Sequence, residues 1–343
     1  MQQNSIFNPL GDDRVQVRSI IKWNSTWLFQ LNATKYTWAK WLYQVMVWNF
    51  WVPEKVSWLG EDWTQFKHLS EDEKRAYKGI LSFLIFLDSI QTVNLPNFND
   101  YITAPEVNLI LSIQAYQEAI HSQSYATILE SVVDSNLRDE IYYFWRDDKH
   151  LLERNKFIGS IYQDFIDTPT DKNFFRGVVA NFLLESIYFY NWFAFFDTLA
   201  EQGKMIATDR MINYIRRDEL THVTIFANII KEIKKEFPDV YSEDVIYEMM
   251  KTAVSQEIEW SKHILWKSII WMSHKNIEDY TKCLANQRLT ILWLDPLYEN
   301  IVENPYKHLD RLQDNNWEKW NFFESTVTNY SQSSSMKGSW DEI

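Results

Sequence analysis

Residues 117–125 read Gln117-Glu118-Ala119-Ile120-His121-Ser122-Gln123-Ser124-Tyr125. Glu118, His121 and Tyr125 stand at positions i, i+3 and i+7, so a helix that turns about 100° per residue would place them on one face. A second Glu-x-x-His follows at Glu219 and His222, and 219 − 118 and 222 − 121 both give 101. The repeated pair predicts two helices that present the same carboxylate and imidazole toward a shared site.

The composition favours a helical protein with a large core. The chain has 343 residues with only 7 glycines and 8 prolines, and glycine at about 2% lies well below its usual share of roughly 7%. Aromatic residues make up 16% of the chain, including 17 tryptophans, and such side chains bury large areas. Few turn residues between long periodic stretches therefore predict an all-α fold.

Charge and cysteine content exclude several classes of function. The net charge is −13 without basic runs, so binding to nucleic acid is not expected. The lone Cys283 cannot form an internal disulfide, which fits the reducing cytoplasm. The start at Met1 lacks the basic and apolar pattern of a signal peptide. The apolar residues 182–196 contain Glu185 and are fewer than the roughly 20 of a membrane span, so no membrane partner is expected.

Three regions of the chain differ in pattern. Residues 1–32 are mixed and polar, and we expect them to form an N-terminal arm over the surface. Residues 33–312 carry the periodic stretches and are expected to form one helical domain. The tail of residues 313–343 is rich in asparagine, glutamine and serine, and we expect it to be flexible. Its aromatic residues Tyr330 and Trp340 leave two interpretations open, a peptide that orders on a partner or a frayed terminus.

Within the middle region, apolar periodicity and helix-start signals predict the helices. Ser70-x-x-Glu73 and Thr103-x-x-Glu106 are capping boxes, and Thr208 is a further start signal. The predicted helices span residues 34–49, 70–96, 103–133, 135–157 and 172–202, then 208 to the turn at 238, 243–273 and 277–294.

Two further carboxylates stand in strongly apolar surroundings. Asp88 lies in an apolar helix, and Glu185 is the only charged residue between positions 182 and 196. An ionised carboxylate buried without a partner is costly, so both require cations nearby. Two Glu-x-x-His pairs with one carboxylate from each of two other helices form the dinuclear metal site of ferritin-like bundles. We therefore predict an all-α ferritin-like helical bundle whose core holds a dinuclear metal site on Asp88, Glu118, His121, Glu185, Glu219 and His222.

Each piece of this pattern also has a simpler interpretation. A lone Glu-x-x-His is common on helix surfaces, and Asp147-x-x-His150 lies in a charged run that we assign to a solvated face. The remaining histidines lack a matching carboxylate in apolar surroundings and are expected at the surface or as satisfied core groups: His68, His263, His274 and His308. Only the combination distinguishes the six ligands. Carboxylate oxygen with imidazole nitrogen suits iron or manganese, whereas structural zinc usually takes thiolates.

With these motifs in place, the sequence resembles the small, radical-generating subunit of class I ribonucleotide reductase. The resemblance covers most of residues 35–330. It rests on the motifs Leu87-Asp88-Ser89-Ile90-Gln91, Glu118-Ala119-Ile120-His121-Ser122-Gln123-Ser124-Tyr125, Glu185-Ser186-Ile187 and Arg217-Asp218-Glu219-Leu220-Thr221-His222. These motifs are more specific than a ferritin-like pattern alone.

The resemblance implies a role for each ligand. One metal corresponds to Asp88, Glu118 and His121, and the other to Glu185, Glu219 and His222, with carboxylates bridging. The ligand types allow two irons, two manganeses or one of each, because they do not separate neighbours in the first-row series.

The resemblance also implies a place for the radical. Tyr125 corresponds to the tyrosine that stores it in most of the family. Phe189, Phe193 and Ile215 correspond to the apolar pocket that shields this tyrosine, although such a stripe is more often plain core packing. Some members keep the tyrosine yet store the oxidant on the metals, so the sequence leaves both forms of storage open.

A radical relay toward a partner is implied as well. Trp51 corresponds to the relay tryptophan of the family, and Asp218 to the aspartate that links this tryptophan to a histidine ligand. Glu324 and Tyr330 are spaced as in the flexible relay segment of the family. The final residues 340–343 resemble the peptide that docks on the large subunit.

The implied enzyme is a ribonucleoside-diphosphate reductase that is active only with its large catalytic subunit. In this mechanism the dimetal site reacts with an oxygen species, and the oxidising equivalent passes through Trp51 and Tyr330 to start the reduction of ribonucleotides. The resemblance further implies a homodimer and admits an activating flavoprotein as a partner. A ferritin-like ligand-binding dimetal oxidase and a storage bundle stay open as alternatives, although neither needs the relay residues.

Overall fold

The computed structural model describes residues 7–265, 272–299 and 304–307. Within these ranges the chain is a bundle of α-helices without strands, apart from one antiparallel bridge between Ile21 and Ile102. The α-helices are α1 (Thr37–Trp48), α2 (Leu59–His68), α3 (Glu71–Tyr101), α4 (Pro105–Val132), α5 (Ser135–Asp147), α6 (Lys149–Asp167), α7 (Asp171–Leu183), α8 (Tyr190–Glu201), α9 (Ile206–Glu236), α10 (Glu243–Ile264) and α11 (His274–Ile291). Shorter segments are the 3-10 helices η1 (Val15–Val17) and η2 (Pro53–Lys55) and the π-helical turn η3 (Leu184–Tyr188).

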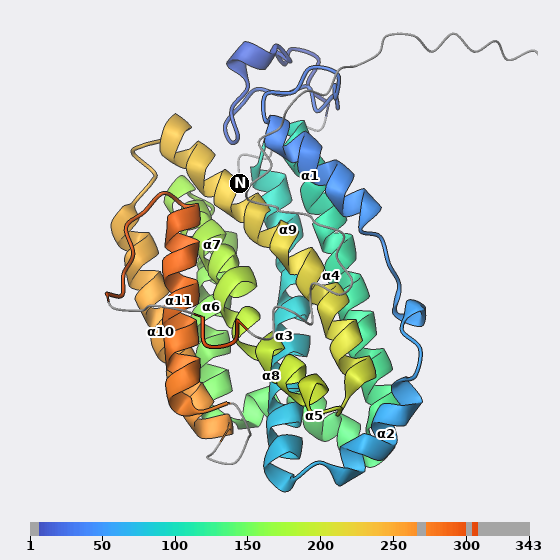
Figure 1. The fold of residues 1–343 in the computed structure, drawn as a ribbon. Helices are drawn as coiled ribbons and strands as arrows, with labels where there is room; N and C mark the ends of the chain where they lie inside the picture. The colour runs from blue at the N-terminus through green and yellow to red at the C-terminus, as the bar shows by residue number, and fades with distance from the viewer. Residues whose placement is uncertain (1–6, 266–271, 300–303, 308–343) are drawn as a thin grey trace, which may run out of the picture.

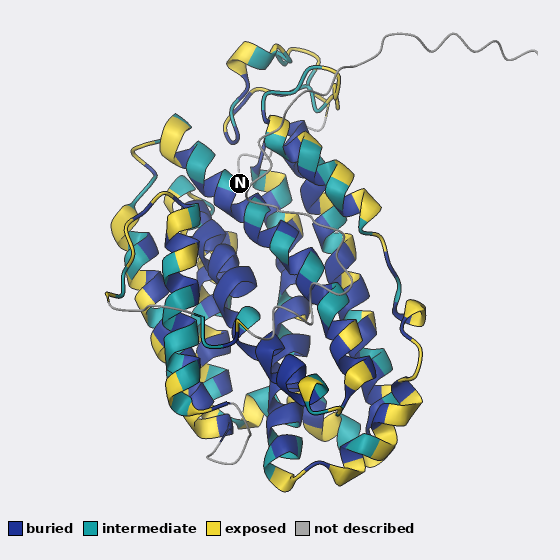
Figure 2. Cartoon of the chain, in the orientation of Figure 1, coloured by how far each residue is buried: buried dark blue, intermediate teal, exposed yellow. Residues whose placement is uncertain are grey.

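The longest helices form the centre of the bundle (Figure 1). α3 packs along α4, α9 packs along α7 and α8, and η3 joins α7 to α8 while contacting α9. Buried residues line the faces that these helices turn toward one another, and exposed residues collect on the outer faces (Figure 2). The all-α prediction is therefore confirmed for the described part of the chain.

α3 begins as predicted but continues beyond its predicted end. The backbone N–H of Glu73 donates to the Ser70 hydroxyl at 3.2 Å, and the Glu73 side chain accepts from the Ser70 N–H at 2.8 Å. Pro96 lies inside the helix, which ends only at Tyr101. Among the described helices α3 alone is long and apolar enough to cross a membrane, but 67% of that apolar window is buried inside the bundle.

Two predicted helix starts are wrong because tertiary partners take the capping groups. α4 has no side-chain cap, since the Thr103 hydroxyl accepts from the backbone N–H of Trp23 at 3.1 Å. α9 begins before Thr208, whose hydroxyl donates to the buried Asp62 at 2.7 Å. A capping pattern therefore marks these regions without fixing their first residue.

Two predicted helices are interrupted. The helix expected over 135–157 divides at Asp148, whose side chain caps the start of α6. The helix expected over 172–202 contains η3, in which the N–H of Phe189 donates to the carbonyl of Leu184 at 3.2 Å. Single π-helical turns inside α-helices often lie at functional sites, and this one carries a predicted ligand.

The N-terminal arm is partly built into the bundle. Ile20 and Ile21 are completely buried, and the bridge to Ile102 fixes them beside the end of α3. The backbone N–H of Ile20 donates to the side chain of Glu236 at 2.9 Å. Residues 1–32 therefore contain buried core residues that their lack of periodicity did not predict.

Candidate metal centre

The six predicted ligands converge in the middle of the bundle. They come from four elements: Asp88 from α3, Glu118 and His121 from α4, Glu185 from η3, and Glu219 and His222 from α9. All six side chains are completely buried. Their ligand atoms form two overlapping groups, and within each group all atoms lie within 4.8 Å of one another.

Two carboxylates connect the groups. Glu118 places its Oε2 3.4 Å from Nδ1 of His121 and its Oε1 3.3 Å from Nδ1 of His222. Glu219 does the same, with its Oε1 3.1 Å from His121 and its Oε2 3.0 Å from His222. Each carboxylate therefore offers one oxygen to either side, which is the arrangement of bridging ligands.

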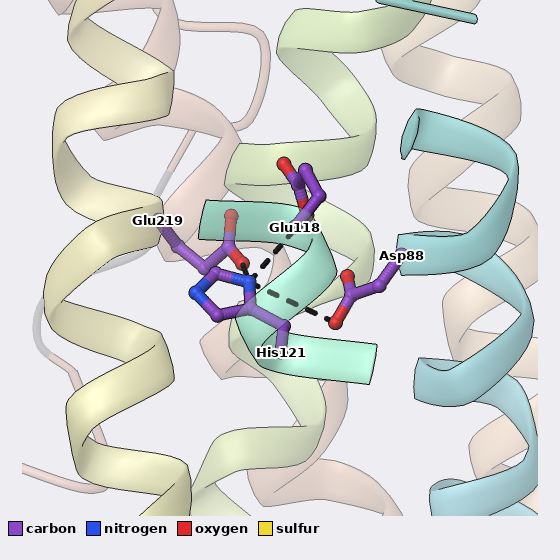
Figure 3. A group of neighbouring side chains, drawn as sticks. All are labelled: Asp88, Glu118, His121 and Glu219. Carbon is purple, nitrogen blue, oxygen red and sulfur yellow. Dashed lines mark ion pairs between the residues drawn. The ribbon is translucent and has the colours of Figure 1, made fainter. Parts of the chain in front are cut away.

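Each side of the site is completed by one further carboxylate. Oδ2 of Asp88 lies 3.8 Å from Nδ1 of His121 (Figure 3), and Oε2 of Glu185 lies 3.8 Å from Nδ1 of His222. We call these two sides the Asp88 half and the Glu185 half. Each half has one imidazole, one carboxylate of its own and a share of both bridging carboxylates.

The unpaired atoms of the site fit a pair of cations. Both oxygens of Asp88, Oε2 of Glu118, Oε1 of Glu219 and Nδ1 of His121 are buried without a hydrogen-bond partner. Buried polar groups are almost always paired, and four carboxylates this close repel one another. Oxygen and imidazole ligands without thiolates suit iron or manganese.

The pKa values of the carboxyl groups also indicate that the site needs positive charge. Burial and the charge of Glu118 raise the pKa of Asp88 well above its usual range. Burial and the charge of Glu185 raise the pKa of Glu219 to about 8. Their ionised forms therefore need compensating positive charge. Glu185 differs, because hydrogen bonds from its neighbours outweigh its burial and lower its pKa.

Nε2 of each histidine, the ring nitrogen that faces away from the ligand carboxylates, also forms a hydrogen bond. Nε2 of His121 donates to Oδ2 of Asp218 at 3.3 Å, and Nε2 of His222 donates to Oε1 of Gln117 at 3.0 Å. A proton on Nε2 leaves the lone pair of Nδ1 facing the carboxylates, which is the tautomer a metal requires. The link to Asp218 was expected from the sequence, whereas the contact with Gln117 was not.

A sequence signal for Gln117 was available. Asp218 immediately precedes Glu219 and supports the histidine of the other helix. Gln117 stands in the same position before Glu118, 101 residues earlier, and supports His222. The repeat therefore includes the residue before each Glu-x-x-His. The side chain of that residue forms a hydrogen bond with the histidine of the other Glu-x-x-His.

Glu185 accepts hydrogen bonds from side-chain amides that were not predicted from the sequence. Its Oε1 accepts hydrogen bonds from Gln91 at 2.5 Å, from Gln114 at 3.0 Å and from Asn181 at 3.2 Å. The hydroxyl of Tyr162 lies 2.9 Å from the amide oxygen of Gln91 and 3.0 Å from that of Asn181. Tyr162 thus steadies the amides that orient Glu185.

The predicted radical tyrosine lies in the Asp88 half. Tyr125 is completely buried and its hydroxyl has no satisfied hydrogen bond. Burial, with the charges of Asp88 and Glu219 beside it, raises its pKa well above the usual range. Phe189, Phe193 and Ile215 are also buried, and the rings of Phe189 and Phe193 stack at 6.0 Å. Their role as a shield for the tyrosine stays a prediction.

The predicted relay begins in the same half. Nε1 of Trp51 donates to Oδ2 of Asp218 at 2.7 Å, so one carboxylate oxygen joins this tryptophan to His121. The ring of Tyr214 stacks on the ring of Trp51 at 5.0 Å. The other predicted relay and docking residues, Glu324, Tyr330 and the tail 313–343, lie outside the described residues.

Known proteins share this sequence and fold. The family model for the ribonucleotide reductase small chain matches residues 28–305. A ribonucleoside-diphosphate reductase subunit beta from Treponema pallidum is 41% identical over 342 residues, which covers 98% of this chain and 97% of the relative. A ribonucleotide reductase R2 subunit from Clostridium botulinum is 46% identical with a TM-score of 0.87, covering 91% of this chain and 98% of that one.

A more distant structure shares the fold alone. It is a dimanganese(II) protein from Streptococcus sanguinis, 21% identical with a TM-score of 0.71, and it matches 81% of this chain and 98% of its own. The family match spans most of the chain and includes all six ligands that meet in the bundle. This chain belongs to the ribonucleotide reductase small-chain family.

Proposed function

We propose that this chain generates an oxidising equivalent at a dinuclear metal centre, holds it, and passes it to a large catalytic subunit. As a member of its family the chain is a subunit of a class I ribonucleoside-diphosphate reductase, and the family works with a large subunit. The observation that carries the proposal is the pair of buried glutamates that each face both histidines.

The residues divide the metal ligands evenly. Asp88 and His121 would hold one cation and Glu185 and His222 the other, with Glu118 and Glu219 shared. Two irons, two manganeses or one of each would supply one-electron oxidation with an oxygen species when bound. The Nε2 hydrogen bonds to Asp218 and Gln117 keep both imidazoles oriented for this task.

We assign storage of the radical to Tyr125. A phenol that loses an electron must also release its proton, and after burial the charge of Asp88 has the largest influence on the pKa of Tyr125. Complete burial keeps water and soluble reductants away from the phenoxyl oxygen. Phe189, Phe193 and Ile215 would form the apolar surroundings that prolong its lifetime.

Export would follow the chain His121, Asp218 and Trp51, which hydrogen bonds join in the described part of the structure. We further propose that Glu324 and Tyr330 continue this relay, within a C-terminal tail of residues 313–343 that docks on the large subunit. The helical domain would then comprise residues 33–312, with residues 1–32 as its N-terminal arm.

The remaining partners are proposed from family resemblance. We propose that the chain forms a homodimer in the cytoplasm, and that a flavoprotein serves as an activating partner. A pull-down with the large subunit tests the tail directly: removal of residues 324–343 is expected to abolish binding. Unchanged binding by the truncated chain would contradict the docking role.

Electron paramagnetic resonance with metal analysis tests the central proposal. The active protein is expected to contain two first-row metal ions per chain and a phenoxyl signal that Tyr125→Phe abolishes. Tyr143→Phe, at a half-exposed tyrosine on α5, is the matched control and should keep the signal. A multiline manganese signal without a phenoxyl component would move storage from Tyr125 to the metals, and a protein without bound metal would refute the function.

A further inference from the structure

A second pair of histidines meets outside the metal centre. His150 lies in the first turn of α6 and His263 in the last turn of α10, and these two helices pack against each other (Figure 1). The ring centres of the two imidazoles are 4.6 Å apart, with an interplanar angle of 34°. From the sequence, His150 was assigned to a solvated face and His263 to a separate surface or core position. The fold instead brings the two rings together.

The ring of His263 is oriented by a buried carboxylate. Nε2 of His263 donates to Oδ2 of Asp148 at 2.8 Å. The side chain of Asp148 is only 7% exposed, and its Oδ1 accepts from the backbone N–H of Leu151 at 3.0 Å, which caps α6. The carboxylate is therefore fixed by the helix that it caps. In the neutral imidazole, a proton on Nε2 leaves the lone pair on Nδ1.

The same support is given to a ligand of the metal centre. There Nε2 of His121 donates to Asp218, and Nδ1 faces the ligand carboxylates. A carboxylate on the second nitrogen of a histidine is the usual support of a metal ligand, because it fixes the tautomer and the orientation of the ring. His263 and Asp148 therefore have the relationship of a metal ligand and its supporting group. The side chain of His263 is 45% exposed, so an ion can approach it from solvent.

The separation of the two rings fits two ligands of one ion. With metal–nitrogen bonds of about 2.0 Å, two imidazoles on one tetrahedral or square-planar ion place their ring centres roughly 4.5–5 Å apart. The observed separation of 4.6 Å lies in this range. The rings of His121 and His222, which face different halves of the metal centre, are farther apart at 5.9 Å. The surface pair therefore has the spacing expected for a single shared ion.

The ligand types distinguish this pair from the metal centre. The metal centre offers carboxylate oxygens together with imidazoles, whereas the surface pair offers imidazole nitrogens. Imidazole suits zinc, copper and nickel, and the affinity of a nitrogen site is higher for these ions than for manganese or iron. Water would complete the coordination of the ion, as it does at open zinc sites. The pair therefore favours a divalent cation from the end of the first-row series.

We infer that His150 and His263 form a second metal site, which binds one late first-row divalent cation such as zinc. Asp148 orients His263 for this ion. The bound ion joins the start of α6 to the end of α10, which are also joined inside the bundle by the buried ion pair of Arg154 with Glu257. Binding of the ion to the folded chain therefore stabilises the packing of these two helices. The inference is independent of the proposed function, because none of the metal-centre ligands takes part.

Zinc binding to the full-length chain, with its metal centre already loaded with iron or manganese, tests the inference. Dialysis against Zn²⁺ and metal analysis should find one zinc per chain in addition to the core metals. His150→Ala and His263→Ala should each abolish this zinc. Asp148→Asn keeps a good helix cap but cannot accept the Nε2 proton through its amide nitrogen, and it should lower the zinc affinity about 10- to 100-fold. His68→Ala, at an exposed histidine of α2, is the matched control and should keep the zinc.

Chemical modification of the unmutated chain locates the zinc without any folding defect. Diethyl pyrocarbonate, which modifies accessible imidazoles, should react with His263 and His68 in the zinc-free chain, and Zn²⁺ should protect His263 alone. Mass spectrometry of the digested protein measures both reactions. Three results would overturn the inference: zinc that only replaces core metals, additional zinc that both alanine variants at positions 150 and 263 retain, and a His263 that stays as reactive with zinc as without it.

Discussion

The Asp88 half and the Glu185 half of the metal centre contain the same ligand types but are supported differently. One oxygen of Glu185 accepts hydrogen bonds from three neutral amides, and His222 is oriented by a fourth, Gln117. Neither oxygen of Asp88 has a partner, and His121 is oriented by the charged Asp218. The protein therefore preorganises one half and leaves the other dependent on what binds there.

This difference matches the chemistry that we propose for each half. Tyr125 and Trp51 are both linked to the Asp88 half. The charge of Asp88 raises the pKa of Tyr125, and Trp51 donates a hydrogen bond to Asp218, which also binds His121. A ligand free of fixed hydrogen bonds can change its position and its proton as the redox state changes. The amide-bound half is suited to hold its cation in one place.

The largest effect is expected from Glu219→Ala, which removes a carboxylate that both halves share. Because Glu219 faces both histidines, its loss should abolish binding of both cations. That exceeds the about 10- to 100-fold loss of affinity seen when a residue that only supports a ligand is replaced. Metal analysis after dialysis measures this, with the exposed Glu153→Ala as the control. Retention of one tightly bound cation would show that Glu219 serves one half only.

Trp51→Phe should separate export from metal binding. An aromatic ring is kept, although a smaller one, and the hydrogen bond to Asp218 is lost. Turnover with the large subunit should therefore fall to background while the metal content stays unchanged. The neighbouring Trp48→Phe, at a side chain that is 87% exposed, is the matched control. Activity close to that of the unmodified chain would remove Trp51 from the relay.

The metal-free protein should lose stability as the pH rises. Burial and the charge of Glu185 raise the pKa of Glu219 from 4.5 to about 8. The unfolded chain therefore releases this proton at a lower pH than the folded chain, and the free energy of unfolding falls as the pH rises between these two values. Hydrogen bonds to carboxylates outweigh burial and hold the pKa of His121 above its usual value, so the stability that protonation provides is also lost with rising pH. Each group contributes up to about 1.4 kcal/mol per pH unit.

Urea unfolding at several pH values measures this dependence. The urea midpoint should be higher near pH 6 than near pH 8. At pH 6 most of the pH range between the unfolded and folded pKa values of Glu219 has not yet been crossed, so most of the loss of stability has not yet occurred. Glu219→Gln should flatten the profile. A metal-free protein that gains stability over the same interval would contradict the assigned pKa shifts.

The smallest effects should have opposite signs in the two halves. In the metal-free protein, Asp88→Asn replaces a buried carboxyl group whose ionised form is destabilised, and it should stabilise the fold by about 1 kcal/mol or more. Gln91→Leu removes one hydrogen-bond donor from Glu185 and should destabilise the fold by about 1–3 kcal/mol. Equilibrium urea unfolding of both variants compares the halves directly. Two changes of the same sign would show that the halves are not supported differently.

The bundle and the convergence of the six candidate ligands could be predicted because both depend on local spacing. Glu118 and His121 share a helix face at i and i+3, and the second pair repeats this at Glu219 and His222. Asp88 stood out as a charge in an apolar helix. These signals remain informative in the folded protein, because several carboxylates buried around two imidazoles need positive charge nearby.

The support of the ligands could not be predicted in the same way. Gln91, Gln114 and Asn181 are ordinary polar residues whose shared partner, Glu185, is set by the packing of three elements. Nothing in the local sequence separates a π-helical turn from an α-helix, so η3 was missed. The caps at Thr103 and Thr208 failed for a related reason, since distant residues compete for their hydroxyls. Helix α2 was also not predicted.

Anomalous X-ray scattering from crystals grown with iron or manganese tests the central claim most directly. Two peaks are expected inside the bundle, one between Asp88 and His121 and one between Glu185 and His222, with Glu118 and Glu219 in contact with both. A single peak, or peaks away from these six side chains, would contradict the account.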